Sequence, residues 1–316
     1  MSKNAAVIIN PNSQNGTCGK RFPAIKPLIE GILGDVKVLT TDGPWVAAEL
    51  TRQALRDGAD LIVSIGGDGT HNEVANGFFE RGEPVKKEAA LAIVPFGTGG
   101  DFRKSLGIDN SPKAAVIATA KNRTADIDLG LLEFIDNQGK RAIRHFVNIT
   151  SAGLGGAVDK KVNESTKALG GKASFAIGTV KAMAGYKNQE ITFSVDGGKK
   201  RTEKMANLVV ANGMFFGGGM WIAPKAKLND GLFDIVVMGD LKLKDFLVHG
   251  GKVYKGEHLK HPKFELMQGR KVVAEAKGDV FLDVDGEAPG KLPCTFTLSP
   301  RALKVIVGEE PALVEP

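Results

Sequence analysis

The chain has 316 residues, enough for two domains and a sizeable hydrophobic core. Apolar residues make up 42% and charged residues 25%, proportions that are ordinary for a soluble globular protein and exclude a disordered chain. The formal charge of +6 suits anionic partners, whereas an aromatic content of 6% argues against stacking on single-stranded nucleic acid.

Cysteine usage and hydropathy favour a cytoplasmic protein. Cys18 and Cys294 lie far apart and match no metal-ligand spacing, as expected in a reducing compartment. The first residues lack the apolar core of a signal peptide. Because no apolar run approaches the roughly 18 residues that span a bilayer, we expect any membrane contact to be peripheral.

The first part of the chain, residues 1–130, alternates short apolar strands with amphipathic helices. Strands are predicted over residues 5–9, 36–41, 60–65 and 90–95, and helices over 22–33, 45–57, 73–81 and 112–121. This alternation predicts an α/β, Rossmann-like domain with a parallel sheet and helices on both faces. Ligands of such sheets bind beyond the carboxyl ends of the strands, where Asn10, Thr41 and the loops 66–70 and 97–101 fall.

A glycine-rich turn, residues 66–70, follows the apolar strand at 60–65 and leads into a helix. Glycines let the backbone approach a ligand, and free N–H groups at a helix N-terminus attract phosphate. Asp68 would repel phosphate unless a cation lay between them, which predicts a nucleotide bridged by Mg²⁺. The alternative is a plain tight turn in which Asp68 caps the helix.

The second part, residues 131–316, changes style to short strands separated by turn signals, which predicts a mostly antiparallel β-sandwich domain. Its last segment could pack back on the first domain. The strands are expected at residues 131–134, 144–150, 191–195, 205–212, 233–238, 280–284, 295–298 and 303–307, and helical stretches at 168–184 and 245–253.

An ordered set of motifs runs through the whole chain and resembles the diacylglycerol kinase catalytic-domain family, most closely its soluble bacterial lipid kinases. The motifs are Asn10-Pro11, residues 66–73, 95–98, 126–130, Asn212-Gly213, 217–219, Ala223-Pro224, 228–234, 256–258, 285–287 and 290–293. The glycine turn alone is shared with NAD kinases and phosphofructokinase-like enzymes. The resemblance implies an ATP-dependent lipid kinase that phosphorylates a lipid hydroxyl, with diacylglycerol giving phosphatidic acid as the leading expectation.

The resemblance also implies the nucleotide site and the catalytic groups. ATP would contact Asn10, Pro11, Asn12, Ser13, Gln14, Thr41, Gly66, Gly67, Asp68, Gly69, Thr70, His71, Asn72 and Thr98. Asp68 would organise catalytic Mg²⁺, helped by Asp128, and Glu287 would be the general base that deprotonates the lipid hydroxyl. The alternative for residues 285–287 is a hairpin turn with solvated acids.

A second Mg²⁺ site is implied at residues 227–232. There the Asp230 carboxylate would combine with the carbonyl oxygens of Lys227 and Leu232 and with water, ligands that Mg²⁺ prefers. The alternative is a surface turn. One departure from the family pattern stands at Gly100, where the family usually has asparagine, and removes an amide able to bond phosphate.

The partners implied are ATP and a lipid acceptor at a membrane surface, with no nucleic acid and with homodimer formation left open. A basic stretch could dock on anionic headgroups or be a solvated helix face; it contains Lys242, Lys244, Lys252, Lys255, Lys260 and Lys263. Alternatives are a kinase for a sphingoid base, ceramide or phosphatidylglycerol, and a non-catalytic nucleotide- or lipid-binding regulator.

Overall fold

The computed structural model describes residues 4–97, 99–165 and 185–314. The chain forms two compact units, and it passes between them twice. The first unit is Met1–Leu129 with Pro300–Pro316, and the second is Gly130–Ser299. The helical stretch predicted at residues 168–184 lies outside the described residues. No helix in the described parts of the chain is both long and apolar enough to cross a membrane.

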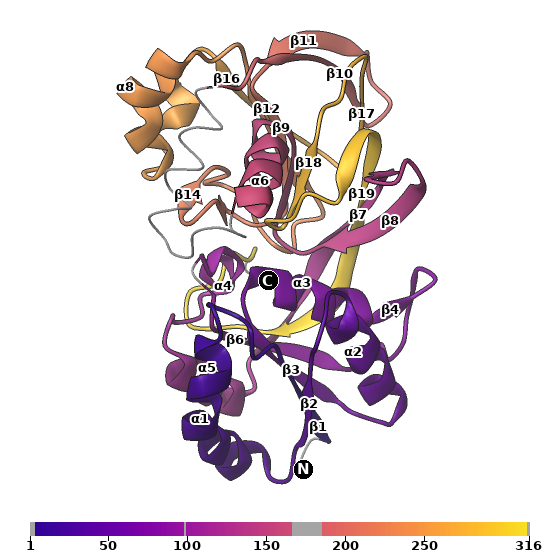
Figure 1. Cartoon of the computed structure of the whole chain (residues 1–316), viewed down its shortest axis with the longest axis vertical. Coiled ribbons are helices and arrows are strands. Elements are labelled where there is room, and N and C mark those ends of the chain that lie inside the picture. Colours follow the sequence, from indigo (N-terminus) through magenta and orange to yellow (C-terminus); the bar gives the residue numbers. More distant parts are fainter. Residues whose placement is uncertain (1–3, 98, 166–184, 315–316) are drawn as a thin grey trace. The chain divides into compact units, whose positions relative to one another are not determined.

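The first unit is built on a parallel sheet, as predicted (Figure 1). Its strand order is β2-β1-β3-β6-β19, and the register pairs are parallel throughout. The central strands are buried along their whole length, which explains their continuous apolar sequences. The strands are β1 (Ala5–Ile9), β2 (Lys37–Thr40), β3 (Leu61–Gly66), β6 (Ala90–Pro95) and the end of β19 (Gly290–Ile306).

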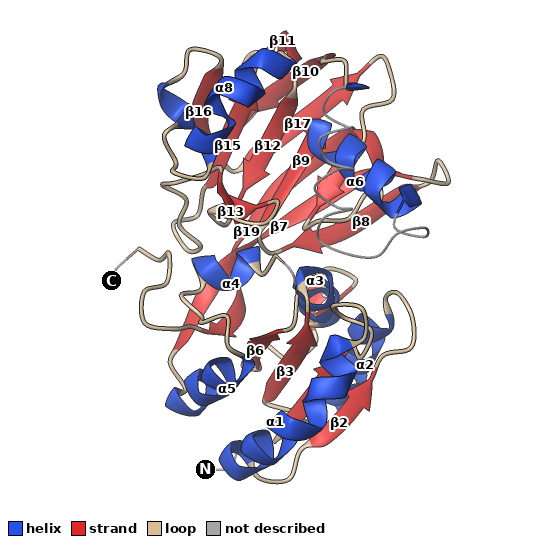
Figure 2. Ribbon diagram, turned by 60° about the vertical axis from the view of Figure 1, so that its left-hand side comes forward, coloured by secondary structure: helices blue, strands red, loops and turns tan. Residues whose placement is uncertain are grey.

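Helices cover both faces of this sheet (Figure 2). α1 (Thr17–Leu33) packs with α5 (Pro112–Lys121), and α2 (Val46–Arg56) packs with α3 (Asp68–Gly77). A five-residue helix, α4 (Asp101–Ser105), follows β6. The helix predicted over residues 73–81 ends earlier, at Gly77, and Phe79–Glu80 instead forms strand β4, which pairs with β5 (Glu83–Pro84) in a small hairpin.

The second unit contains two antiparallel sheets. One has the order β16-β15-β12-β9-β18; the other contains β11-β10-β17-β19, with β7 and β8 paired to each other. The strands are β7 (Thr124–Asp136), β8 (Arg141–Phe146), β9 (Ile149–Gly153), β10 (Gln189–Val195), β11 (Arg201–Met205), β12 (Asn207–Ala211), β15 (Phe233–Met238), β16 (Phe264–Gly269), β17 (Lys271–Ala276) and β18 (Leu282–Val284). The remaining elements are α6 (Leu154–Ser165), α8 (Leu243–Val253), the short helix η1 (His258–Lys260) and a hairpin of β13 (Phe215–Phe216) and β14 (Met220–Trp221).

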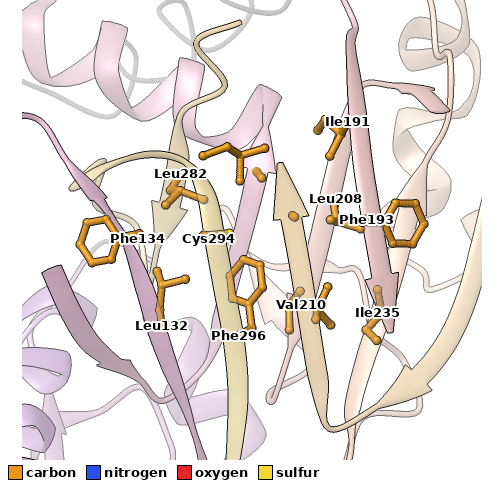
Figure 3. Packing of buried hydrophobic residues seen from close by; sticks show 14 of the residues in the cluster. Leu132, Phe134, Ile191, Phe193, Leu208, Val210, Ile235, Leu282, Cys294 and Phe296 are labelled. Carbon is orange, nitrogen blue, oxygen red and sulfur yellow. The ribbon is translucent and has the colours of Figure 1, made fainter. Parts of the chain in front are cut away.

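A hydrophobic core lies where the inward faces of these two sheets meet (Figure 3). Strand β12 shows the period of two: Leu208 and Val210 join this core, whereas Val209 packs in a second cluster on the opposite face. Phe146 stacks on Phe233 with ring centroids 5.5 Å apart. The two packed antiparallel sheets confirm the prediction of a mostly antiparallel β-sandwich for the second part of the chain.

Several predicted strand bounds differ from those in the structure, and in two places the division of the chain into strands is wrong. The single strand expected over residues 144–150 is two strands, because the chain turns at Val147 and Asn148 to leave one sheet and enter the other. Conversely, the strands expected at 295–298 and 303–307 are one strand, β19, which continues through Pro300. Arg301 adopts a positive φ of 48°, and its N–H donates to Asp128 at 2.7 Å, so the irregular step is satisfied without ending the strand.

We expect Phe146→Ala to lower the free energy of unfolding of the second unit by about 3–5 kcal/mol, because it removes a fully buried ring that contacts Phe233 and Phe296. Urea unfolding followed by circular dichroism measures the loss. Ile143→Ala, on the same strand at a position that is 67% exposed, is the control and should change stability little. Equal losses in both variants would contradict this description of the core.

Candidate functional site

The glycine turn at the end of β3 requires its glycines. A Cβ on Gly66 would lie 2.6 Å from the Thr70 side chain, and one on Gly97 would lie 2.9 Å from the Gly67 Cα. The turns that follow β3 and β6 therefore approach each other backbone to backbone. Helix α3 begins within the first turn, at Asp68, so its free N–H groups lie at the carboxyl end of the parallel sheet.

Of the two carboxylate oxygens of Asp68, only one accepts a hydrogen bond from the described residues. Its Oδ2 accepts a hydrogen bond from the Asp101 N–H at 3.2 Å, whereas its Oδ1 is buried and has no partner among the described residues. Burial, and then the nearby charge of Asp101, raise the pKa of Asp68. Asp101 is itself paired with Lys104 at 2.7 Å. An unpartnered buried carboxylate oxygen fits a cation, so this site can hold Mg²⁺.

The loop after β1 is tied to the glycine turn. Asn10 Nδ2 donates to Thr70 Oγ1 at 3.1 Å, and Asn10 Oδ1 accepts from the Asn12 N–H at 3.0 Å. The loop then enters α1 through Gln14 and two further residues of positive φ. The structure therefore joins two of the loops predicted to contact a nucleotide. Pro11 and Ser13 lie in the same loop, and Thr41 is buried at the end of β2.

Two residues predicted to contact ATP direct their side chains into the protein. His71 is buried, and its Nδ1 lies 2.8 Å from Ser64 Oγ. Asn72 is fully buried, and its Oδ1 accepts from Asn76 Nδ2 at 3.2 Å. Their contribution to a ligand would therefore come from the backbone of Gly69 to Asn72. Thr98 lies outside the described residues.

Position 100, where the sequence departs from the family pattern, has a left-handed backbone with φ 58°. A Cβ there would lie 2.9 Å from Arg103 Nε, so Arg103 occupies space that a larger residue would need. Arg103 also donates to the Ile108 carbonyl at 3.0 Å. No sequence motif singles out this arginine. Asp128, which was predicted to help Asp68 organise catalytic Mg²⁺, is fully buried, and its carboxylate accepts a hydrogen bond from the Arg301 N–H.

The loop predicted to hold a second metal ion lies before β15 in the second unit. Asp230 Oδ1 accepts from the Leu232 N–H at 3.0 Å, which folds the loop back on itself. Asp234 is 1% exposed, and within the described parts of the chain its carboxylate oxygens have no hydrogen bond of good geometry, although the Gln268 side chain lies beside it on β16. Burial and then the charge of Asp230 raise the pKa of Asp234 to about 6. A cation beside Asp230 would compensate this charge, so the loop fits a metal.

Within the described parts of the chain, no group of three or more His, Cys, Asp or Glu side chains is arranged to hold a metal ion. Any Mg²⁺ at Asp68 or at the 227–232 loop would therefore be completed by backbone carbonyls, water or phosphate oxygens, as this ion commonly is. The carbonyl groups of Lys227 and Leu232 flank Asp230 in the chain.

The predicted base, Glu287, sits in a tight turn after β18. The turn is closed by reciprocal backbone hydrogen bonds between Val284 and Glu287 at 2.8 and 3.1 Å. Asp285 and Gly286 have positive φ values of 50° and 87°. Asp283 Oδ1 accepts from the Gly286 N–H at 2.9 Å and fixes the turn from below.

Asp285 fastens this turn to the corner between β8 and β9. Its carboxylate accepts three backbone hydrogen bonds, from Val147 at 2.9 Å, Asn148 at 3.1 Å and Ile149 at 2.9 Å. Burial raises the pKa of Asp285 to about 6, against the opposing effect of these N–H groups and of Arg144. Asp285, which the sequence analysis named only as part of the 285–287 motif, therefore has a structural role: it holds the turn against the corner between β8 and β9.

Arg144, on β8, donates through Nη2 to Glu287 Oε2 at 2.7 Å. Its side chain is 3% exposed, whereas that of Glu287 is 39% exposed. Sequence analysis missed this partner, because nothing in the spacing links two residues 143 positions apart. Glu287 Oε1 makes no hydrogen bond with the described residues, so one carboxylate oxygen is held and the other can accept a proton.

Two further carboxylates lie beside this turn. Asp159 on α6 and the buried Asp283 on β18 interact closely, and burial raises the pKa of both, that of Asp159 to about 6. Gly155 makes the approach of α6 to β9 possible, since a Cβ there would clash with Ser151 Oγ. The nearby charge of Asp159 adds to burial in raising the pKa of Asp283.

Comparison with known proteins identifies the class to which this fold and these residues belong. The family described as the diacylglycerol kinase catalytic domain matches residues 4–132. The family described as the YegS C-terminal NAD kinase beta sandwich-like domain matches residues 148–307. The chain belongs to this family of diacylglycerol kinase-type proteins, as the motifs predicted.

Individual relatives cover the whole chain. A diacylglycerol kinase of Staphylococcus aureus is 27% identical in sequence to this chain. The alignment covers 98% of this chain and 96% of the relative. A solved structure from Bacillus anthracis, assigned to the diacylglycerol kinases, has a TM-score of 0.78 at 24% identity and covers 99% of this chain and 98% of its own. Yeast NADH kinase, solved with NADH, has the same general fold, with a TM-score of 0.56 at 11% sequence identity. The match covers 98% of this chain and 84% of the yeast chain.

The buried His71 makes the first unit sensitive to acid. Burial lowers its pKa to about 3, from an ordinary value near 6.5, so below about pH 6.5 the unfolded chain binds a proton that the folded chain does not. We expect the free energy of unfolding to fall by about 1.4 kcal/mol per pH unit below 6.5 from this group. His71→Asn should flatten that slope in urea titrations from about pH 7.5 to 5. Parallel curves for the two proteins would refute the assignment.

Asp285→Asn should destabilise the second unit by about 1–3 kcal/mol, because an amide can present only one acceptor oxygen and leaves the remaining buried N–H group unpaired. Urea unfolding measures the change. Asp279→Asn is a matched control, since Asp279 is exposed and its ion pair with Lys291 contributes little. A free energy of unfolding equal to that of the control would show that the three hydrogen bonds to Asp285 contribute little to stability.

Proposed function

We propose that this protein is an ATP- and Mg²⁺-dependent lipid kinase that transfers the γ-phosphoryl group to the hydroxyl of diacylglycerol, giving phosphatidic acid. The observation that carries the proposal is the half-satisfied, buried carboxylate of Asp68 in a glycine turn at the carboxyl end of β3. Family membership and the name of the Staphylococcus aureus relative support the reaction class and the acceptor.

In this proposal the first unit binds the nucleotide. The phosphates approach the backbone N–H groups of the turn at residues 66–70 and of the loop that Asn10 ties to it. Thr41, which is buried at the end of β2, would add a further contact, and the family resemblance adds Thr98. When bound at Asp68, Mg²⁺ would neutralise charge on the transferring phosphoryl group.

The second unit supplies the base. Glu287 Oε1 accepts the proton of the lipid hydroxyl, and the hydroxyl oxygen forms a bond to the γ-phosphorus as the bond to the β,γ-bridging oxygen breaks. ADP leaves with that oxygen. The loop at Lys227, Asp230 and Leu232 would hold a structural Mg²⁺ that stabilises the second unit.

The acceptor is proposed to reach the protein from a membrane surface, with the region of α8 in contact with it. Val248 and Tyr254 are 71% and 57% exposed, and Lys252, Lys255 and Lys260 are exposed close to them in the chain. Exposed apolar side chains interleaved with lysines suit an anionic lipid interface. This supports peripheral association of a cytoplasmic protein.

We expect transfer of labelled phosphate from ATP to diacylglycerol in mixed micelles with Mg²⁺. Asp68→Asn and Glu287→Gln should each lower kcat by roughly 100-fold or more, because one organises charge at the phosphoryl group and the other takes the proton. Ceramide, a sphingoid base and phosphatidylglycerol form the comparison panel.

Label on another lipid of the panel would reassign the acceptor and retain the kinase class. Unchanged turnover in both variants would overturn the assigned roles. ATP binding by calorimetry without transfer to any lipid would point to a nucleotide-binding regulator instead.

A further inference from the structure

Glu287 has an environment unlike that of a base on a free loop. It lies in a four-residue turn whose ends are joined by two backbone hydrogen bonds and whose middle is fixed by Asp283 and Asp285. The backbone of the turn is therefore rigid. Its side chain, however, is 39% exposed and would sample several rotamers if nothing held it.

Arg144 is the group that holds it. The guanidinium is almost completely buried, and it donates to Glu287 Oε2 at 2.7 Å. A buried arginine requires nearby negative charge, and here Glu287 and Asp285 provide it. Because β8 places Arg144 three residues before the corner that Asp285 fastens, the arginine and the turn are supported by the same backbone.

We propose that Arg144 is a positioning residue for the transfer: it fixes the Glu287 carboxylate through Oε2 and leaves Oε1 aimed at the acceptor hydroxyl. This inference rests on the proposed function. It assigns Arg144 no contact with ATP or lipid, and it predicts that the arginine acts only through Glu287.

A purely structural role is the competing explanation, since Arg144 also neutralises the buried Asp285. The two roles differ in what they change. Loss of structural support would lower stability and raise KM values without regard to chemistry, whereas loss of positioning lowers kcat because a misplaced base is less effective.

The test compares Arg144→Met, Arg144→Lys, Glu287→Gln and the double variant Arg144→Met/Glu287→Gln, with Arg141→Met as control. Arg141 is an exposed arginine on the same strand, so its replacement should leave kcat, KM and stability unchanged. Each protein is assayed for transfer to diacylglycerol, and its thermal unfolding is recorded.

Positioning predicts that Arg144→Met lowers kcat by roughly 10- to 100-fold with both KM values within about two-fold of wild type. Arg144→Lys should recover part of the loss, and added guanidinium should partly restore Arg144→Met. The double variant should be no slower than Glu287→Gln alone, because the arginine has nothing left to position.

A kcat within two-fold of wild type for Arg144→Met, or losses that multiply in the double variant, would overturn the proposal. If Arg144→Met unfolds at the assay temperature, Arg144→Lys decides: full activity refutes positioning and partial activity at unchanged KM supports it. Wild-type turnover in Glu287→Gln would instead refute Glu287 as the base, which is a failure of the proposed function.

Discussion

The second unit depends on one carboxylate, that of Asp285, which accepts the backbone N–H groups of Val147, Asn148 and Ile149. Where β8 ends and β9 begins, the chain leaves one sheet for the other, and three successive N–H groups lose their place in a ladder. Buried N–H groups need acceptors, and Asp285 supplies all three. The same side chain determines where the Glu287 turn sits.

In the first unit the decisive constraint is the close packing of the glycine turns around Asp68. There the turn after β6 comes so close to Gly67 that position 97 requires glycine, while Gly66 leaves room for Thr70 within its own turn. Helix α3 begins at Asp68, so its free N–H groups lie beside that carboxylate. Among the described residues no group donates to Asp68 Oδ1, and burial raises the pKa of this carboxyl group. Such a group has a cost in stability and is expected where a ligand completes the site.

Much of this arrangement was predictable from the sequence because it is local. The apolar strands, the glycine turn and the alternation of strand and helix predicted the parallel sheet correctly, and the turn signals predicted an antiparallel second unit. What could not be predicted depends on distant partners: the corner at Val147 needs Asp285, and the role of Arg144 needs Glu287. Strand β19 was predicted as two strands; it continues through Pro300 because Asp128, distant in the sequence, accepts the N–H of the next residue.

The division of the chain affects how the protein is made. The first unit takes its outer parallel strand from the end of β19, where Lys304 and Val305 pair with β6. During synthesis from the N-terminus, this edge of β6 therefore has no partner until residues 304 and 305 have left the ribosome. An unpaired parallel edge invites association with other chains, so a nascent or truncated product would be more prone to aggregate than the finished protein.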